Sequence, residues 1–351
     1  MSRQLMTGAR APVMRNSEEP GGPRLALSVV VPCFNEEEVL RETNARLIAV
    51  LEGISPNFEI VYVDDGSTDS TPDLLREMQL HENRVRAIRF SRNFGHQVAI
   101  TAGLEHARGE AVVIIDADLQ DPPEVIREFF QKWLDGHDVA YGVRMEREGE
   151  TAFKRGSAKL FYRFISHLSD TSIPLDTGDF RLMDRRVVDA LLAMPERDRF
   201  VRGMVSWLGF SQVAVPYRRA ARFAGDTKFS LFKMMRFATD GIVSFSILPL
   251  RMATWIGFAA SGIALVEIVV ALFDRIFTHG LVRGWTSTVI AIWFVGGVQL
   301  ICMGIIGEYV GRIYGESKRR PLYVVQERMG FEATDAGDAL RLRVRMTAGG
   351  R

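Results

Sequence analysis

The sequence predicts an α/β fold for the first two thirds of this 351-residue chain and a pair of membrane-spanning helices after it. Between residues 25 and 225, short apolar runs alternate with helical stretches, which is the pattern of a doubly wound parallel sheet. Residues 252–273 contain one charged side chain, and residues 287–307 contain none. Because about 20 apolar residues in a helix cross the hydrocarbon core of a bilayer, both later stretches are long enough to span it.

Strands and helices of the α/β half follow from residue type and spacing. Runs rich in Val, Ile and Phe are expected to form strands at residues 25–32, 58–65, 85–90, 112–119 and 138–144. Stretches with apolar residues three or four positions apart are expected to form helices at residues 36–53, 69–81, 96–109 and 122–136. Ligands of such folds bind at the carboxyl ends of the parallel strands, so the residues that follow each strand are the first candidates for a site.

Polar clusters follow three of these strands. The first strand ends in VVVPCFNEEE, the second in VYVDDGSTDST and the fourth in VVIIDADLQD. An acidic helix cap would explain any one cluster alone, but three clusters at one edge of a sheet favour a shared ligand. No G-x-G-x-x-G follows the first strand and no G-x-x-x-x-G-K-[ST] occurs in the chain, which argues against a dinucleotide oxidoreductase and a P-loop nucleotidase.

The third cluster places three carboxylates close together, those of Asp116, Asp118 and Asp121. Asp116 and Asp118 would point the same way if the strand continued. Two carboxylates in that position suit Mg²⁺ or Mn²⁺, because such hard cations bind carboxylate and pyrophosphate oxygens together. Asp121 precedes two prolines and is expected to cap the next helix.

Composition argues against several other classes of protein. The 44 basic and 43 acidic residues give a formal net charge of +1, which disfavours a broad basic face for nucleic acid. Cys33 and Cys302 lie far apart without C-x-x-C spacing, so reduced packing residues are expected rather than a disulfide or a zinc site. Residues 1–24 are polar and lack the apolar core of a signal peptide, which predicts a disordered leader.

The membrane half is expected to be a two-helix hairpin over residues 251–314, followed by a cytoplasmic tail over residues 315–351. Lys and Arg number eight in the two flanks of the hairpin and two in its link, so the positive-inside rule places the α/β half and both termini in the cytoplasm. Residues 226–250 have the pattern of a basic amphipathic helix on the membrane surface, although an ordinary surface helix can share it. Glu267 in the first span has two interpretations: it marks an oligomer contact or a lipid path, or its side chain is simply protonated or extends to the membrane interface.

Seven motifs in order strengthen this interpretation: SVVVPCFNEEE, YVDDGSTDST, FSRNFGHQVAITAGLEHARGE, VVIIDADLQDPPE, DTGDFRLMDR, RFVRGMVSWLGF and GEYVGRIYGESKRRPLYVV. Over residues 25–325 the chain resembles the GT-A family-2 glycosyltransferases, above all polyprenyl-phosphate glycosyltransferases of the bactoprenol glucosyltransferase type, and it is similar to dolichol-phosphate mannose synthases. The resemblance implies a metal-dependent, inverting enzyme at the plasma (inner) membrane. Such an enzyme moves a sugar from a nucleotide-sugar donor to a polyprenyl phosphate acceptor for cell-envelope glycosylation. It also implies a homo-oligomer, with a tetramer as one form.

The resemblance also implies roles for individual residues. The residues expected around the nucleoside are Pro32, Asn35, Glu36, Asp64, Asp65 and Asp116. The metal-binding D-x-D would be Asp116 and Asp118, with Asp118 the direct ligand on which catalysis depends. Asp179 would stand near the acceptor, with Asp176 as its substitute. The cationic residues expected to hold phosphate oxygens are Arg202, Arg218, Arg219, Arg222 and Lys228, although any one of them could also belong to a solvated basic surface.

The donor sugar and two rival functions stay open at the level of the sequence. UDP-glucose is the first donor to consider, and GDP-mannose, UDP-GlcNAc, UDP-galactose and an amino-arabinose donor follow it. A processive polysaccharide synthase shares the early motifs but usually carries Q-x-x-R-W and more membrane spans, whereas this chain has RGMVSWLGF. A non-catalytic membrane scaffold would have no reason to keep mutually repulsive carboxylates clustered.

Overall fold

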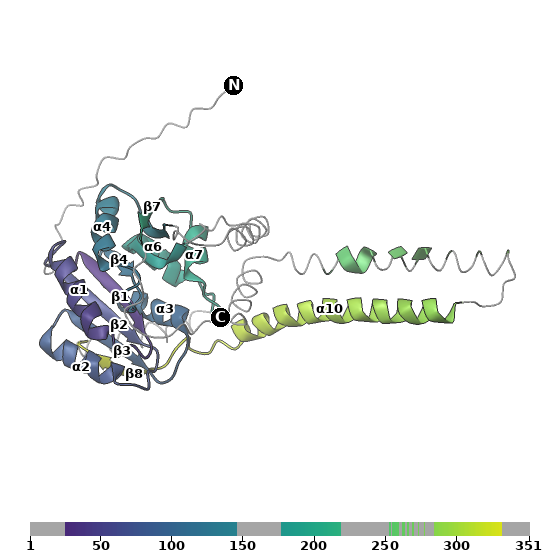
Figure 1. Ribbon diagram of the computed structural model, residues 1–351, viewed down its shortest axis with the longest axis horizontal. Coiled ribbons are helices and arrows are strands. Elements are labelled where there is room, and N and C mark those ends of the chain that lie inside the picture. The colour runs from purple at the N-terminus through teal and green to yellow at the C-terminus, as the bar shows by residue number, and fades with distance from the viewer. Residues whose placement is uncertain are drawn as a thin grey trace, which may run out of the picture. The chain divides into compact units, whose positions relative to one another are not determined.

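The computed structural model describes residues 25–145, 177–218 and 284–331, together with scattered positions between 253 and 277. The chain divides into two compact units. The first unit comprises residues 1–155, 172–228 and 321–351 and contains the sheet, and the second comprises residues 156–171 and 229–320 and contains a long helix (Figure 1). The predicted leader, the juxtamembrane segment 226–250 and Glu267 lie outside the described residues.

The first unit is built around one eight-stranded sheet with the order β7-β5-β6-β4-β1-β2-β3-β8. Its strands are β1 (Leu27–Cys33), β2 (Phe58–Asp64), β3 (Val85–Phe90), β4 (Ala111–Ile114), β5 (Val139–Arg144), β6 (Thr177–Asp184), β7 (Gln212–Tyr217) and β8 (Val325–Met329). Its described helices are α1 (Leu40–Glu52), α2 (Thr71–His81), α3 (His96–His106), the 3₁₀ turn η1 (Pro123–Val125), α4 (Ile126–Leu134), α6 (Arg185–Ala193) and α7 (Val201–Trp207).

The four central strands pair as the sequence predicts, because β3, β2, β1 and β4 are parallel neighbours. The predicted parallel sheet is only part of the observed one, since β6 runs antiparallel to β4 and β5, and β8 runs antiparallel to β3. Apolar alternation identifies a strand, but it does not encode the direction of the strand beside it. Strand β4 also ends at Ile114, so Asp116 and Asp118 follow the strand instead of continuing it.

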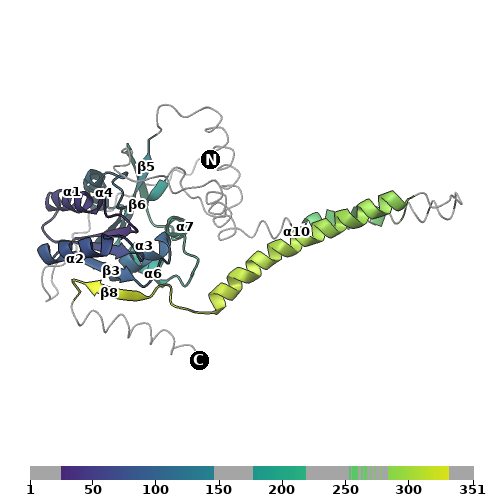
Figure 2. The same cartoon turned by 60° about the horizontal axis from the view of Figure 1, so that its bottom comes forward.

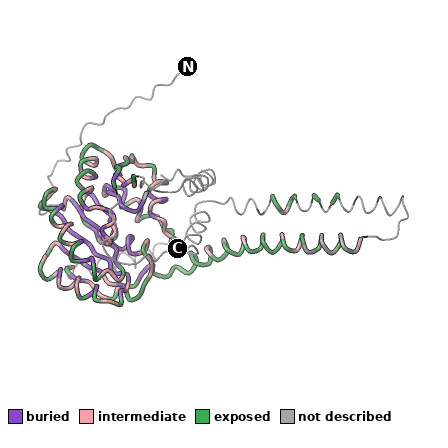
Figure 3. Tube along the Cα trace, viewed as in Figure 1, coloured by how far each residue is buried: buried purple, intermediate pink, exposed green. Residues whose placement is uncertain are grey.

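Helices cover both faces of the sheet, which confirms the doubly wound arrangement. Apolar residues of α1, α2 and α4 form one core cluster with alternate strand residues such as Ile60 and Tyr62. The intervening residues Val61 and Val63 face the other side, where they pack in a second cluster with Ala99 and Ala102 of α3. The central strands are therefore buried on both faces, as Figure 3 shows.

The segment that follows the long helix returns to the sheet. Strand β8 pairs with β3 and forms the edge of the sheet, as Figure 2 shows, and the Tyr323 ring stacks on Phe90 with centroids 4.8 Å apart. The Arg76 guanidinium donates to both carboxylate oxygens of Glu327, at 2.9 and 2.7 Å. Residues 321–331 are thus part of the α/β unit rather than of a separate tail. Residues 315–317 of the predicted tail form the end of the long helix, and residues 332–351 lie outside the described residues.

The second unit contains α10 (Trp285–Ser317), which covers the second predicted span. Among the described residues one stretch of helix, Phe294–Ser317, is long and apolar enough to cross a membrane, and none of its hydrophobic window is buried. Large apolar side chains such as Leu300 and Met303 are exposed along it (Figure 3). The described positions between 253 and 277 are helical, and the Cys302 thiol lies 3.4 Å from the carbonyl oxygen of Ala253. Cys33 and Cys302 are free thiols.

Candidate active site

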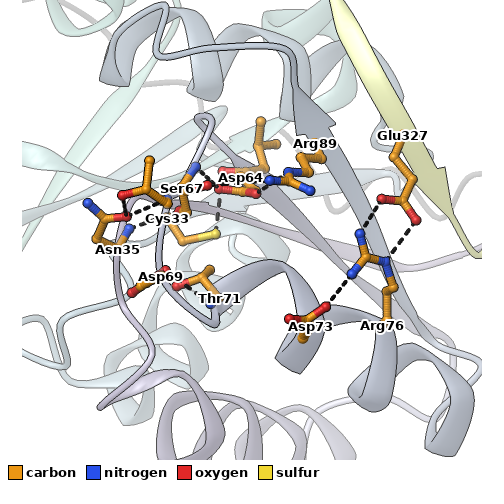
Figure 4. A network of polar contacts seen from close by, with 12 residues as sticks. Cys33, Asn35, Asp64, Ser67, Asp69, Thr71, Asp73, Arg76, Arg89 and Glu327 are labelled. Atoms are coloured by element: carbon orange, nitrogen blue, oxygen red, sulfur yellow. Dashed lines mark hydrogen bonds and ion pairs between the residues drawn. The ribbon is translucent and has the colours of Figure 1, made fainter.

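The loops after β1 and β2 are tied together at the carboxyl edge of the sheet. Asn35 adopts a left-handed backbone conformation with φ of 54°. Its backbone N–H donates to the Ser67 hydroxyl at 2.9 Å, and its side-chain oxygen accepts from the Thr68 N–H at 2.9 Å (Figure 4). The Glu36 N–H donates to the Thr71 hydroxyl at 2.9 Å. Two of the predicted nucleoside-binding clusters therefore converge, as expected from parallel strands that share an edge.

Pro32, Asp64 and Asp65 are buried beneath these loops. Pro32 lies within β1. Asp64 is fully buried, accepts from the Ser67 N–H at 2.9 Å and lies 3.4 Å from Nε of Arg89. Burial raises the pKa of Asp64, although the hydrogen bonds from Ser67 and the charge of Arg89 oppose the shift. Asp64, the last residue of β2, is therefore at the carboxyl edge but shielded from solvent.

Asp65 fixes the loop that leads into α3. Its two carboxylate oxygens accept from the backbone N–H groups of Phe94 and Gly95, at 2.6 and 3.0 Å. Gly95 has φ of 105°, a conformation that favours glycine. Asp65 thus fixes the backbone just before α3. The first two residues of α3 are His96 and Gln97. The sequence predicts a nucleoside contact for Asp65, and the structure adds this supporting role.

Asp116 and Asp118 lie half-buried just beyond β4, on either side of buried Ala117. The Asp118 carboxylate accepts from the Gln120 N–H at 3.1 Å. Burial, and to a smaller extent the nearby charges of Asp121, Asp179 and Asp118, raise the pKa of Asp116 to about 6, while His96 opposes the shift. Burial is therefore the main cause of the shift, and the neighbouring carboxylates add to it.

This donor set fits a hard divalent cation. Two oxygen-donating carboxylates next to each other are what Mg²⁺ or Mn²⁺ takes from a protein when phosphate oxygens and water complete its shell. Among the described residues no group of three or more His, Cys, Asp or Glu side chains could hold a metal ion. A cation here would rely on ligands from the bound substrate.

Asp179 of β6 is the centre of a charged cluster beside this pair. Its Oδ2 accepts from Nε2 of Gln97 at 2.8 Å and lies 3.5 Å from Nε2 of His96. Its Oδ1 lies 3.4 Å from Nε of Arg202, and the same His96 nitrogen lies 3.6 Å from Oδ1 of Asp116. The His96 imidazole therefore stands between the predicted metal pair and the predicted acceptor residue.

These contacts decide the charge states of the cluster. Burial alone would raise the pKa of Asp179, but His96, Arg202 and Arg181 outweigh burial and hold it well below its usual range. Desolvation alone would lower the pKa of His96, but its hydrogen bond to Asp179 and the charges of Asp116 and Asp179 raise it to about 9. At neutral pH Asp179 is a carboxylate and His96 is an imidazolium.

The predicted cationic residues are placed less completely. Arg202, the second residue of α7, lies in the cluster, and Arg218 is exposed just after β7. The other cationic candidates, Arg219, Arg222 and Lys228, lie outside the described residues, and so does Asp176, the predicted substitute for Asp179.

Sequence reasoning missed His96 and Gln97, although they are two polar residues at the start of a helix whose next three residues are apolar. The prediction that Asp121 caps a helix is wrong, because η1 has Pro122 at its cap position and the Asp121 carboxylate accepts from the Tyr217 hydroxyl at 2.5 Å. Asp121 is 1% exposed, so this contact with β7 is internal.

A carboxylate cluster at the carboxyl edge of an α/β sheet stands where ligands of such folds bind. Residues 28–192 match the family described as Glycosyl transferase family 2, and residues 248–313 match the GtrB C-terminal hairpin.

Relatives cover most of the chain. The uncharacterized glycosyltransferase YkcC of Bacillus subtilis (strain 168) is 49% identical over 87% of this chain and 94% of its own. The prophage bactoprenol glucosyl transferase homolog of Escherichia coli (strain K12) is 41% identical over 86% of this chain and 99% of its own. The bactoprenol glucosyl transferase of Shigella phage SfV is 41% identical over 86% of this chain and 98% of its own. The chain therefore belongs to glycosyl transferase family 2, and the predicted resemblance is confirmed.

Proposed function

We propose that this glycosyltransferase moves a single sugar from a nucleotide-sugar donor to a polyprenyl phosphate at the cytoplasmic face of the plasma membrane. UDP-glucose is the donor we favour, because similar proteins are named bactoprenol glucosyl transferases. GDP-mannose, UDP-GlcNAc, UDP-galactose and an amino-arabinose donor are the alternatives. We include two membrane spans, at residues 252–273 and 287–307, and a homo-oligomer in the proposal.

One observation carries the proposal: a single His96 nitrogen lies 3.6 Å from Asp116 and 3.5 Å from Asp179. The residues assigned to the donor and those assigned to the acceptor are therefore close enough to serve one reaction centre. Arg202, on the far oxygen of Asp179, supplies a guanidinium that suits a phosphate.

In the mechanism the donor pyrophosphate lies at Asp116 and Asp118, with the nucleoside towards Asn35, Glu36 and the Asp64–Asp65 pair. A Mg²⁺ or Mn²⁺ ion held by Asp116 and Asp118 would neutralise charge on the departing nucleoside diphosphate. Arg202 orients the acceptor phosphate, with Arg218, Arg219, Arg222 and Lys228 as further candidates for phosphate contacts.

The acceptor phosphate attacks the anomeric carbon, and the configuration at that carbon inverts. A phosphate monoester has a second pKa of about 6 and is largely dianionic at neutral pH, so the nucleophile needs no strong base. Asp179, whose pKa is well below its usual range, is a poor proton acceptor. Its role is to hold Arg202 and His96 in place, with Asp176 as a substitute candidate.

The membrane anchor complements this chemistry. A polyprenyl chain stays in the bilayer, so its phosphate meets the enzyme only at the interface. The exposed apolar length of Phe294–Ser317 supports attachment there. Confinement to the acceptor's surface raises the frequency of productive encounters.

The test uses the full-length protein in lipid nanodiscs with undecaprenyl or decaprenyl phosphate and each candidate nucleotide sugar. Mass spectrometry should show a lipid phosphate carrying one hexose, formed fastest with UDP-glucose. A polymer attached to lipid or released would indicate a processive synthase. No transfer from any donor, together with no thermal stabilisation by nucleotide plus Mg²⁺, would refute the proposal in favour of a scaffold.

A further inference from the structure

Gln97 uses both ends of its side-chain amide in the site. Its Nε2 donates to Oδ2 of Asp179 at 2.8 Å, and its Oε1 accepts from the backbone N–H of Val201 at 2.9 Å. Both contacts are distant in sequence, by 82 and 104 residues respectively. One half-buried side chain therefore joins the start of α3 to β6 and to the start of α7.

The orientation of this amide follows from its partners. A backbone N–H can only donate, so the group that faces Val201 must be the amide oxygen. The amide nitrogen then faces Asp179, and an ionised carboxylate only accepts. No other assignment satisfies both contacts, which removes the usual ambiguity of amide groups.

Each contact constrains a different part of the acceptor-side cluster. The bond to Oδ2 fixes the rotation of the Asp179 carboxylate and keeps Oδ1 directed at Nε of Arg202, 3.4 Å away. The bond to Val201 satisfies one of the first N–H groups of α7, whose cap residue Phe200 makes no side-chain capping bond. Arg202 is the next residue, so the same amide also sets the origin of the Arg202 side chain.

We propose that Gln97 is a positioning residue that holds Asp179 and Arg202 as one unit for the acceptor phosphate. This inference rests on the proposed function. Gln97 touches neither substrate nor the transferred sugar; it acts through its two partners. A displacement of about 1 Å at a reacting group is enough to cost roughly a hundredfold in rate, so such a brace has a measurable effect on kcat.

Glutamine is one of few side chains that can do this. Glutamate has the same shape and can still accept from Val201, but it directs a carboxylate at the carboxylate of Asp179. Leucine has similar size and makes neither bond. The two substitutions therefore separate the α7 contact from the Asp179 contact.

The experiment compares Gln97→Glu and Gln97→Leu with a matched control, Gln131→Glu. Gln131 of α4 also donates its amide to an aspartate, Asp135 at 3.1 Å, but both residues are exposed and belong to neither cluster. Transfer from UDP-glucose to polyprenyl phosphate is measured in nanodiscs with the full chain. Thermal unfolding and the fraction of folded protein are measured on the same samples.

Both Gln97 variants should lower kcat by about 10- to 100-fold while the KM for the donor changes less than about threefold. Gln97→Glu should stay folded at the assay temperature with a lower melting temperature, because its carboxylate faces the buried carboxylate of Asp179, and Gln131→Glu should keep wild-type kinetics. Combining Gln97→Leu with Asp179→Asn should cost much less than the product of the two single losses, because both changes disrupt one unit.

Three results would overturn the inference while leaving the proposed function intact. The first is a kcat within twofold of the wild type in both variants. The second is a loss that is explained wholly by unfolded protein, with Gln97→Glu fully active, which would make Gln97 only a cap for α7. The third is strict multiplicativity with Asp179→Asn. A wild-type protein that transfers nothing would instead overturn the proposed function, and this inference with it.

Discussion

Replacement of Asp179 by asparagine separates an orienting role from a proton-accepting role. The amide has the same shape, but one oxygen becomes an NH₂ group and the negative charge is lost. An amide oxygen at the Oδ2 position can still accept from Gln97, 2.8 Å away. The NH₂ group would then face Nε of Arg202, where the carboxylate oxygen now lies at 3.4 Å.

The magnitude follows from the number of contacts that change. The facing atoms of Asp179 and Arg202 form an ion pair without a hydrogen bond. We take about 1.5–3 kcal/mol for its loss, the range for a polar contact with a charged group, and each 1.4 kcal/mol corresponds to about tenfold in rate. Loss of the charged contact with Arg202, with the Gln97 bond retained, should therefore lower kcat by about 10- to 100-fold. A base essential for proton removal would cost more, and the depressed pKa of Asp179 argues against that role.

The assay is transfer to polyprenyl phosphate at saturating donor and Mg²⁺, from pH 5 to pH 8. The rate should fall on the acid side near pH 6 in both proteins, because the acceptor phosphate loses its second negative charge there. Asp179 itself stays ionised over this range. Loss of all measurable activity in Asp179→Asn, or loss of the acid limb in that variant alone, would refute the orienting role.

Three other predictions follow from the same structure. Asp118→Ala should lower transfer by more than about 10³-fold, which is a greater loss than in Asp179→Asn, and excess EDTA should abolish turnover of the wild type. Equal losses in the two variants, or full activity in EDTA, would contradict the metal assignment. The pKa of Asp116 is raised to about 6, so the fraction of Asp116 in the metal-binding carboxylate form falls about fourfold from pH 7.5 to pH 5.5. Calorimetry should show that Mg²⁺ with intact UDP-glucose binds more weakly at pH 5.5 by a similar factor. An affinity that does not change with pH would argue against Asp116 as a ligand. Glu59→Ala should lower the unfolding free energy by about 3–5 kcal/mol, because Glu59 (2% exposed) lies 2.9 Å from Nη1 of the equally buried Arg86. In a thermal melt, the control Glu77→Ala at the exposed Arg41–Glu77 pair should change the melting temperature much less.

The fold was predictable where the signal is local. The apolar runs of β1, β2, β3 and β5 and the helices between them were expected at nearly their observed positions, because burial on one or both faces leaves a period along the chain. Strand β4 was expected to extend to residue 119 but ends at Ile114. Strand direction was not predictable in this way. β6 and β8 pair antiparallel with their neighbours, and β8 comes from a segment that reads as the start of a polar tail.

The candidate site likewise has a part that was predictable from the sequence and a part that was not. The sequence by itself determined that Asp116 and Asp118 follow one apolar run, that Asp64 and Asp65 end another, and that the chain belongs to a glycosyltransferase family. Only the tertiary structure decided that Asp121 bonds to Tyr217 instead of capping a helix. The capping prediction used adjacent residues alone, whereas the partner lies 96 positions away.

Tertiary structure alone also decided how the acceptor-side cluster is assembled. Gln97 meets Asp179 across 82 positions and Val201 across 104, and His96 bridges two carboxylates from different strands. Hydrophobic period and motif spacing record which residues are buried or adjacent along one element. The contacts that fix charge and orientation depend on strand order, strand direction and the point at which α3 begins, and these are set by the packing of the whole sheet.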